Sequence, residues 1–514
     1  MNGAEILVGT LTDGGIHTCF TNPGTSEMHI VAALDRGRGI RCVLGLFEGV
    51  VTGAADGYAR MAGEPACTLL HLGPGLGNGL ANLHNATRAR VPIINIVGQH
   101  PAQHLRYDPP LASDIEGIAR PYSKWLRTSR AACELGRDTA EAIASARTPP
   151  GQIATLIVPA DVAWSDGGSI GYISSPPVAP MPTGKAIERA AAMLRSGVRT
   201  ALLLAGDSLY GEGLRTAGRI AGASGAKLVA PYPFTRIQRG AGRPVVQRMA
   251  YVPEQATEQL REFSQIILVG ASAPVSYFAY PGKRSELVPP GCEIHTLATE
   301  SEDCSGALAR LAEELGPSDT HRVAVKSVRT QEPSGEITLS GLALAIAAVL
   351  PENAIVADES MTSGRGIMAA TQGAPPHDWV ACTGGSIGIA MPLAVGAAVA
   401  CPDRPVLCLT ADGSGMYTAQ ALWTMAREGL NVATVVFANR AYAVLKREFL
   451  SLGVGEPGAC ARNLFEIDRP ELDWVSLAKG MGVPAKRVTS LQDFAKTLRE
   501  GLESGGPYLI EVPL

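Results

Sequence analysis

The segment from residue 406 to residue 438 predicts two buried strands joined by a turn and a helix. Val406–Thr410 and Val432–Ala438 are apolar runs of strand length, with a helix-like segment between them. Asp412 follows the first strand and Asn439 follows the second. Parallel neighbouring strands end at one edge of a sheet, which is where open α/β sheets bind ligands. The unit therefore predicts a polar ligand site at Asp412 and Asn439.

The residue types at this edge suit a divalent cation and a phosphate. A carboxylate and an amide oxygen are hard ligands of the kind that Mg²⁺ takes together with phosphate oxygens. Asp412–Ser414 is expected to form a tight turn, and Thr418–Gly429 the helix after it. Gly413 would let backbone N–H groups approach a phosphate near the start of a helix. Asp-Gly turns occur in many α/β proteins, so the turn alone does not identify the ligand.

The 27-residue spacing of Asp412 and Asn439 resembles the thiamine diphosphate fingerprint, Gly-Asp-Gly, a spacer and then Asn-Asn. The resemblance implies that Asp412, Asn439 and the backbone carbonyl of Ala441 hold Mg²⁺ against the diphosphate. Ala411 and Ala438 replace the first glycine and the first asparagine, but the metal-binding asparagine is kept, so metal binding is expected. The same resemblance implies further cofactor contacts from Gly413, Ser414 and Tyr442.

Two linkers divide the 514 residues into three parts. Residues 174–182 form a Pro-rich linker, and a polar linker runs from Gly316 through His321 to about Gly335. Each part alternates helix-like and strand-like segments, and the chain is too long for one core. We therefore expect an α/β fold with three doubly wound, mostly parallel-sheet domains. The expected domains are residues 1–172, 184–320 and 336–514, and expected strands include Cys67–Leu70, Ile93–Val97, Ala201–Ala205, Ile266–Val269 and Ile355–Ala357.

Composition and charge exclude several classes of function. A net charge of −4 lacks the basic surplus of a nucleic-acid-binding protein. The ten cysteines form no Cys-x-x-Cys pair, so neither a zinc site nor a disulfide framework is indicated. The N-terminus does not resemble a signal peptide, and no apolar stretch is long enough to span a membrane. We therefore expect a cytosolic protein with no nucleic-acid or membrane partner.

A second motif lies in the first part of the chain. Cys42–Glu48 is expected to be a strand that ends with a carboxylate, and Gly49–Arg60 a helix of small residues. A strand over Thr68–His71 and a glycine loop over Leu72–Asn78 are expected to follow. This order resembles the pyrimidine-binding domain of the pyruvate decarboxylase and acetolactate synthase superfamily. In that family the pyrimidine domain and the diphosphate domain flank a Rossmann-like middle domain.

The resemblance implies that Glu48 hydrogen-bonds N1′ of the aminopyrimidine of thiamine diphosphate. Its apolar neighbours Leu46, Phe47 and Val50 would favour the protonated carboxyl, so that Glu48 can exchange a proton with N1′. The cofactor then carries out the carbon chemistry, and the protein positions and polarises it.

Two segments of the third part carry further cofactor contacts by the same resemblance. Ala381–Pro392 resembles the loop and helix that precede the Mg²⁺ motif. There the Gly385 carbonyl would accept from the 4′-amine, and Ile387 would be the apolar wedge that bends the cofactor. Asp358–Ser363 resembles the segment whose hydroxyls, in particular that of Thr362, meet the diphosphate.

Each of these residues also has a simpler explanation. Glu48 alone would be read as a solvated carboxylate at a strand end, and His71 as a hydrogen-bonded core histidine. The glycines of Ala381–Pro392 also fit an ordinary helix start. Two motifs of one cofactor in a single chain favour the cofactor interpretation.

Short phrases of the sequence resemble proteins named as acetolactate synthase large subunits. These phrases are Asn22–Glu27, Leu46–Gly49, Leu70–Gly75 and Phe278–Gly282. Benzoylformate decarboxylase is similar too, with an Asn-Pro-Gly-Ser opening and a histidine at the position of His71. The resemblance implies substrate contacts from Thr25, Ser26, His71 and Asn78, and cofactor contacts from Pro23, Gly24 and Asn78.

The sequence has fewer candidate side chains for protonating the reaction intermediate than the decarboxylases have. Val275–Tyr280 lacks the second active-site histidine of benzoylformate decarboxylase, and Gln99–His104 does not match the His-His pair of pyruvate decarboxylase. Leu445 stands where some decarboxylases carry an acid. We therefore expect decarboxylation and carboligation of 2-oxo acids, as in acetolactate synthase. The alternative is a benzoylformate decarboxylase-like, non-oxidative decarboxylase.

Two other classes of function remain open from the sequence. A catalytically silent cofactor-binding relative is disfavoured because Glu48 is kept alongside the Mg²⁺ motif. A nicotinamide or flavin oxidoreductase is disfavoured, and FAD is not expected, because Leu204–Asp207 and Val269–Ser272 lack a Gly-x-Gly-x-x-Gly loop. The resemblance also implies a homodimer or homotetramer, with each site between the Glu48 domain of one chain and the Asp412 domain of its neighbour.

Overall fold

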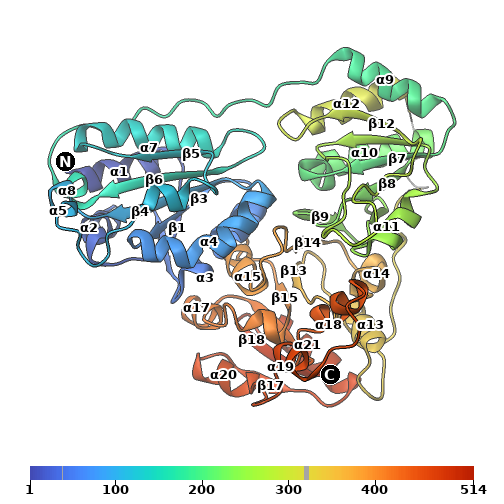
Figure 1. The fold of residues 1–514 in the computed structure, drawn as a ribbon. Coiled ribbons are helices and arrows are strands. Elements are labelled where there is room, and N and C mark those ends of the chain that lie inside the picture. The colour runs from blue at the N-terminus through green and yellow to red at the C-terminus, as the bar shows by residue number, and fades with distance from the viewer. Residues whose placement is uncertain (38, 318–322) are drawn as a thin grey trace.

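The computed structural model of the chain contains three β-sheets, each accompanied by helices (Figure 1). The structure describes residues 1–37, 39–317 and 323–514. All strand pairings within the three sheets are parallel except that of β9 (Arg236–Arg239) with β14 (His377–Ala381), which is antiparallel. The expected α/β fold with three mostly parallel sheets is confirmed.

The first sheet has six strands in the order β2-β1-β3-β4-β6-β5. Its central strands are buried on both faces, because helices cover both sides. Its strands are β1 (Thr18–Asn22), β2 (Arg41–Leu44), β3 (Ala66–Leu70), β4 (Ile93–Gln99), β5 (Trp125–Thr128) and β6 (Ile153–Pro159). Its helices are α1 (Gly3–Asp13), η1 (Thr25–Glu27), α2 (Met28–Arg36), α3 (Glu48–Ala62), α4 (Leu72–Ala89), α5 (Ala102–Leu105), α6 (Ile115–Ala119), α7 (Ala132–Ala146) and α8 (Ala160–Trp164).

The second sheet has five strands in the order β10-β8-β7-β11-β12 and lies at the upper right of Figure 1. Its strands are β7 (Thr200–Leu204), β8 (Lys227–Ala230), β10 (Val246–Arg248), β11 (Gln265–Val269) and β12 (Glu293–Ala298). Its helices are α9 (Gly184–Arg195), η2 (Gly206–Leu209), α10 (Gly211–Ser224), α11 (Pro253–Leu260) and α12 (Cys304–Leu315).

The third sheet has seven strands in the order β17-β18-β16-β15-β13-β14-β9. Besides β9 and β14, its strands are β13 (Ile355–Glu359), β15 (Val406–Ala411), β16 (Val432–Ala438), β17 (Ala485–Arg487) and β18 (Tyr508–Pro513). Its helices are α13 (Leu339–Val349), α14 (Ile367–Ala370), η4 (Thr371–Gly373), α15 (Ala390–Ala400), α16 (Asp412–Gly415), α17 (Ala421–Glu428), α18 (Ala443–Ser451), α19 (Ala459–Phe465), α20 (Trp474–Gly480) and α21 (Leu491–Glu503). None of the helices in the described ranges is both long and apolar enough to cross a membrane.

The segments that connect the sheets are long. Residues 167–183, which include the Pro-rich stretch, contain no helix or strand and arch from the first sheet to α9 (Figure 1). The expected domain end at 320 and the linker residue His321 fall within 318–322, outside the described residues. The middle part of the chain also sends out strand β9, which completes the third sheet beside β14.

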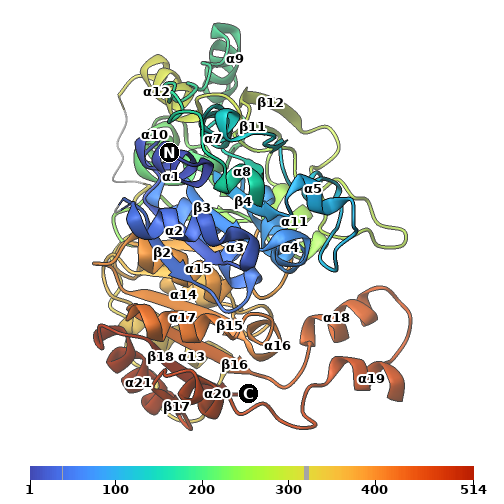
Figure 2. The ribbon, with the colours of Figure 1, turned by 90° about the vertical axis from the view of Figure 1, so that its left-hand side faces the viewer.

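Helices α3 and α15 join the first and third sheets. One buried core runs from the first sheet through α3, α4 and α15 to the third sheet, and α3 lies directly against α15 (Figure 2). Glycines allow this approach: a Cβ at Gly57 would collide with the backbone of Leu393, and one at Gly396 with the backbone of Ala54. The two domains that carry the sequence motifs are therefore fixed to one another.

Replacing Gly396 by alanine should destabilise the protein, because the added Cβ meets backbone atoms of Ala54 and Tyr58 that cannot rotate away. We expect Gly396→Ala to lower the free energy of unfolding by about 1–3 kcal/mol, seen as a lower urea midpoint. Gly184→Ala is the matched control, since nothing lies within 4 Å of a Cβ there. Equal urea midpoints for the two variants would show that α3 and α15 can move apart without a loss of stability.

Candidate functional site

Glu48 lies at the first position of α3 rather than at the end of a strand. Strand β2 already ends at Leu44, and Phe47 is the extended residue that precedes the helix. The expected strand end is therefore wrong, because the chain turns through Gly45, whose N–H donates to Thr21 O (3.1 Å), before α3 begins. A carboxylate in the first turn of a helix interacts favourably with the helix dipole.

A contact from α4 holds the Glu48 carboxylate in place. Asn78 Nδ2 donates to Glu48 Oε2 at 2.9 Å, and Gly75 lies so close that a Cβ there would be 3.2 Å from Glu48 Oε1. Glu48 is partly exposed, and the neighbouring Leu46 is 47% exposed. Within one chain, Leu46 therefore does not shield this carboxylate from water.

Leu72–Asn78 was expected to be a glycine loop. In the structure it forms the first two turns of α4 instead. The packing against α3 outweighs the low helix propensity of glycine. Thr52 Oγ1 donates to Gly79 O at 2.9 Å, and a Cβ at Gly79 would press against the Thr52 methyl group. The glycines thus bring α4 against α3, so that Asn78 can reach Glu48.

A buried carboxylate that the sequence analysis missed holds His71. Glu27 Oε2 lies 2.7 Å from His71 Nδ1, and Gly24 N donates to the same oxygen at 2.7 Å. Glu27 is fully buried. Burial raises the pKa of Glu27, while the Gly24 N–H and His71 oppose that rise. A Cβ at Gly98 would overlap Glu27 Oε1, so a small residue is required there.

The other expected residues of this domain lie along the same sheet edge. Thr25 and Ser26 form η1 with Glu27, and Thr25 is exposed whereas Ser26 is half-buried. Pro23 and Gly24 lead into η1, and a Cβ on Gly24 would strike the His71 ring. The expected residues at the ends of β1 and β3 therefore gather around His71. Glu27 is the last residue of the segment Asn22–Glu27 that resembles acetolactate synthase large subunits. Only its burial in the structure distinguishes it from a surface glutamate.

A second cluster lies at the carboxyl ends of β15 and β16. Asp412 is buried and accepts from Arg440 N (2.6 Å) and Gly413 N (2.8 Å). Asn439 Oδ1 accepts from Ala441 N at 3.0 Å. Arg440 has a φ of +56°, a left-handed conformation, and its N–H is the one that donates to Asp412. Asp412 and Asn439 are thus brought to one point, as expected from their strand ends.

Several neighbours complete this second cluster. Asp412–Gly415 is a single helical turn rather than the expected tight turn, and the next helix begins at Ala421 instead of Thr418. The Tyr442 ring covers Gly413, and the Ser414 hydroxyl bonds to the backbone of Ala411. Ser363, the residue after Thr362, touches the cluster, since its hydroxyl accepts from Asn439 Nδ2 at 3.3 Å.

The donors in the second cluster suit a hard cation and a phosphate. Burial raises the pKa of Asp412, against the Arg440 and Gly413 N–H groups. A divalent cation at this point would favour the ionised carboxylate and take further oxygens from a phosphate. No cluster of three or more His, Cys, Asp or Glu side chains that could hold a metal occurs in the described ranges. A cation site made of the Asp412 carboxylate, the Asn439 amide and the Ala441 carbonyl would offer oxygen ligands without needing three such side chains.

The segment between β14 and α15 carries the remaining expected cofactor residues. Gly385 has a φ of +78°, and a Cβ on it would collide with the Tyr277 hydroxyl. Ile387 is half-buried in the same turn. Beyond it, Glu359 is fully enclosed and accepts from the N–H groups of residues 388, 389 and 390 at 3.0–3.3 Å. This carboxyl fixes the end of the segment that enters α15.

Within one chain the two clusters are separate. Among the residues that the structure describes, no hydrogen bond or ion pair joins the Glu48–Asn78–His71–Glu27 group to the Asp412–Asn439–Ser363 group. Each group lies where the strand order reverses on its own sheet, next to β1 and β3 in one and next to β13 and β15 in the other. Ligands of open α/β sheets bind at such positions.

Two family models match the chain. Residues 1–117 match "Thiamine pyrophosphate enzyme, N-terminal TPP binding domain", and residues 364–512 match "Thiamine pyrophosphate enzyme, C-terminal TPP binding domain". The first range contains Glu48 and His71, and the second contains Asp412 and Asn439.

Full-length relatives carry two kinds of name. A Mycobacterium tuberculosis protein named "Putative acetolactate synthase large subunit IlvX" is 52% identical over 100% of this chain and 99% of its own length. A Pseudomonas aeruginosa benzoylformate decarboxylase is 27% identical over 97% of this chain and 96% of its own length. A Rhodococcus jostii 4-hydroxybenzoylformate decarboxylase structure superposes with a TM-score of 0.87 at 24% identity, covering 100% of this chain and 99% of that one.

The burial of Glu359 predicts that the stability of the folded protein depends on pH. Burial raises the pKa of Glu359 to about 8, although the three N–H donors oppose the shift. The folded state therefore holds a proton that the unfolded state releases near 4.5, so stability is lost as the pH rises from about 4.5 to about 8. We expect the loss to be on the order of 1.4 kcal/mol per pH unit.

Glu359→Gln should flatten this dependence, because an amide cannot ionise. The measurement is the free energy of unfolding of the cofactor-free protein between pH 5 and pH 9. Glu64→Gln, at an exposed position of the same residue type, should keep the wild-type slope. Identical slopes for wild type and Glu359→Gln would contradict the assignment to Glu359.

Proposed function

Because this chain belongs to the thiamine pyrophosphate enzyme family, we propose that it is a thiamine diphosphate- and Mg²⁺-dependent enzyme that decarboxylates and ligates 2-oxo acids, as an acetolactate synthase does. The observation that carries the proposal is the pairing of an oriented Glu48 carboxylate with the Asp412–Asn439 cluster in a single chain. The name of the relative at 52% identity supports the same reaction type.

We assign the cofactor contacts to both clusters. Asp412, Asn439 and the Ala441 carbonyl would hold Mg²⁺, and the backbone N–H groups of the turn at Gly413 would face the diphosphate. Glu48 would exchange a proton with N1′ of the aminopyrimidine, with Asn78 keeping its carboxylate in place. Once bound, thiamine diphosphate supplies the thiazolium that accepts the electron pair released when the carboxylate of a 2-oxo acid leaves.

The group around His71 would bind the substrate. Glu27 holds the His71 ring through Nδ1, so Nε2 is the nitrogen left to meet a substrate oxygen. The hydroxyls of Thr25 and Ser26 lie on the same sheet edge and could orient the carboxylate of the 2-oxo acid.

The outcome after loss of CO₂ depends on the next reactant. Leu445 is 44% exposed on α18 and offers no proton, and Phe278 offers none either. This favours addition to a second 2-oxo acid. The Glu27–His71 pair favours the alternative, a benzoylformate decarboxylase-like reaction, because a histidine can supply a proton. The name of the 27%-identical relative supports that alternative.

We further propose a homodimer or homotetramer in which each site combines the Glu48 cluster of one chain with the Asp412 cluster of its neighbour. The separation of the two clusters within one chain supports this arrangement. So do apolar side chains left exposed on and around α18 and α19, which stand apart from the third sheet in Figure 2. They are Leu445, Leu450, Leu452, Val454 and Leu464.

The first test is turnover with Mg²⁺, thiamine diphosphate and a panel of 2-oxo acids that includes pyruvate and benzoylformate. We expect acetolactate and CO₂ from pyruvate, measured by mass spectrometry, and a rate at least about 100-fold lower for Glu48→Gln. The exposed Glu64→Gln is the matched control and should retain the wild-type rate. Aldehyde without a ligated product would favour the decarboxylase, and no turnover of any acid would contradict both reactions.

Glu27→Gln tests the role of the His71 group. The amide keeps the volume but replaces the carboxyl group that faces His71 with a group that cannot ionise, so we expect kcat/KM for the 2-oxo acid to fall by about 100-fold. Affinity for thiamine diphosphate, measured by calorimetry, should stay within about twofold of wild type. A loss of cofactor affinity as large as the loss of kcat/KM would mean that Glu27 supports the cofactor instead.

A further inference from the structure

We propose that Asn85, assisted by Arg60, is a positioning residue that aims the Gly385 carbonyl at the cofactor. The inference rests on the proposed function, in which Gly385 meets the 4′-amine of thiamine diphosphate. It adds a group of α3 and α4 residues that grip residues 381–386, which we call the acceptor segment.

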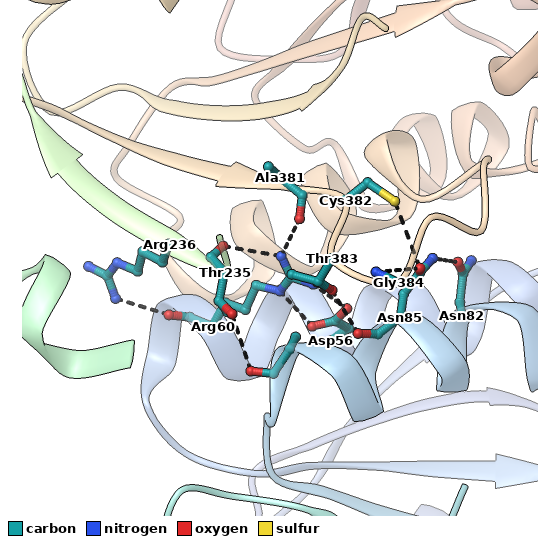
Figure 3. Close-up of polar contacts among 11 residues, drawn as sticks. Asp56, Arg60, Asn82, Asn85, Thr235, Arg236, Ala381, Cys382, Thr383 and Gly384 are labelled. Atoms are coloured by element: carbon teal, nitrogen blue, oxygen red, sulfur yellow. Dashed lines mark hydrogen bonds and ion pairs between the residues drawn. The ribbon is translucent and has the colours of Figure 1, made fainter. Parts of the chain in front are cut away.

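Three hydrogen bonds join the Asn85 side chain to the backbone of the acceptor segment; Figure 3 draws the one from Gly384 N, together with a longer contact from Cys382 Sγ to Asn85 Oδ1 at 3.8 Å. Its Oδ1 accepts from Gly384 N at 3.1 Å and from Ser386 N at 3.2 Å, and its Nδ2 donates to Ser386 O at 2.8 Å. The side chain has no exposed surface. Thr383 Oγ1 adds a bond to the Asn85 carbonyl at 2.7 Å. One side chain of α4 thus bonds three backbone groups of residues 384 and 386.

These bonds determine the direction of one carbonyl. The peptide bond between Gly385 and Ser386 is trans, since the cis bonds of the structure all precede prolines elsewhere. In a trans peptide the N–H and the C=O point in opposite directions. Because the Ser386 N–H points at Asn85, the Gly385 carbonyl points away from α4, out of the buried contact. Asn85 therefore sets the orientation of the carbonyl to which we assign the 4′-amine contact.

The local backbone favours glycine at two positions of the acceptor segment. A Cβ at Gly384 would lie 2.6 Å from Asn85 Oδ1 and 3.0 Å from Asn85 Cα. Gly385 has a φ of +78°, a backbone conformation that residues other than glycine rarely adopt. The acceptor segment is thus shaped to lie against Asn85 on one side and to turn its carbonyl to the other.

Arg60 holds the start of the same segment. It donates from Nη1 to Ala381 O at 2.6 Å and from Nη2 to Thr383 Oγ1 at 3.2 Å. Asp56, one turn earlier on α3, accepts from Arg60 through both oxygens at 2.7 Å, and neither side chain is exposed. An arginine held in this bidentate way has few alternative rotamers, so it can fix the segment precisely.

Residues from the middle part of the chain also contact α3 and α4 beside the acceptor segment. Arg60 Nη1 also donates to Thr235 O at 3.2 Å, and Arg236 Nη1 donates to Arg60 O at 3.0 Å. Thr235 Oγ1 donates to Ala89 O, at the end of α4, at 3.3 Å. All three parts of the chain therefore meet at the acceptor segment (Figure 3).

The experiment compares two ligands by calorimetry in the presence of Mg²⁺. One is thiamine diphosphate, and the other is its analogue with hydrogen in place of the 4′-amine, which cannot donate to the Gly385 carbonyl. We expect wild type to bind thiamine diphosphate about tenfold more tightly than the analogue, the worth of one hydrogen bond. Asn85→Leu should bind thiamine diphosphate about tenfold more weakly and the analogue unchanged, so that the preference disappears.

Asn95→Leu is the matched control. Asn95 is as fully buried as Asn85, but it accepts from Thr68 Oγ1 and donates to Thr155 Oγ1 within the first sheet, away from the acceptor segment. It should lose stability and keep the tenfold preference. Thr383→Val provides a milder second variant in case Asn85→Leu does not fold, and it should reduce the preference to about threefold.

The possible failures are distinguishable. An equal loss of affinity for both ligands in Asn85→Leu, or an unreduced preference in Thr383→Val, would overturn the inference and leave the proposed function intact. Equal affinities in wild type would overturn the inference as well, because Gly385 would then make no such contact. No binding of thiamine diphosphate by wild type would overturn the proposed function and the inference together.

Discussion

The close contact between α3 and α15 is the constraint on which the rest of the structure depends. Gly57 and Gly396 bring the two helix backbones together, and a single core then extends from the first sheet to the third. Glu48 begins one of these helices, and the segment held by Glu359 leads into the other. A shift of α3 along α15 would therefore displace residues that we assign to the cofactor on both sheets at once. This is why polar groups such as Arg60 and Asn85 can be buried there with their hydrogen bonds satisfied.

The parts of the fold and site that the sequence predicted are those encoded over short stretches. Apolar runs bounded by glycine marked the strands, and the parallel sheets followed from their alternation with helices. Asp412 and Asn439 could be paired in advance because each directly follows a strand, and parallel neighbouring strands end together. The C-terminal family model matches residues 364–512, a range that contains both residues.

The parts that the sequence did not predict depend on contacts between distant residues. Glu27 became a candidate only when its burial beside His71 was visible, since a buried and a solvated glutamate look alike in a sequence. The glycines of 72–78 were expected to form a loop because glycine disfavours helices, yet packing against α3 makes them helical. Asn85 and Gly384 are about 300 residues apart, and no local pattern connects them.

Strand β9 has a consequence for how such a chain can change in evolution. It comes from the middle part of the chain but covers β14, the strand that would otherwise be the open edge of the third sheet. An uncovered edge of this kind, with Trp379 and Val380 beside it, invites pairing with another molecule and aggregation. The middle part is therefore not a freely exchangeable insert: a replacement would have to bring its own strand to protect that edge.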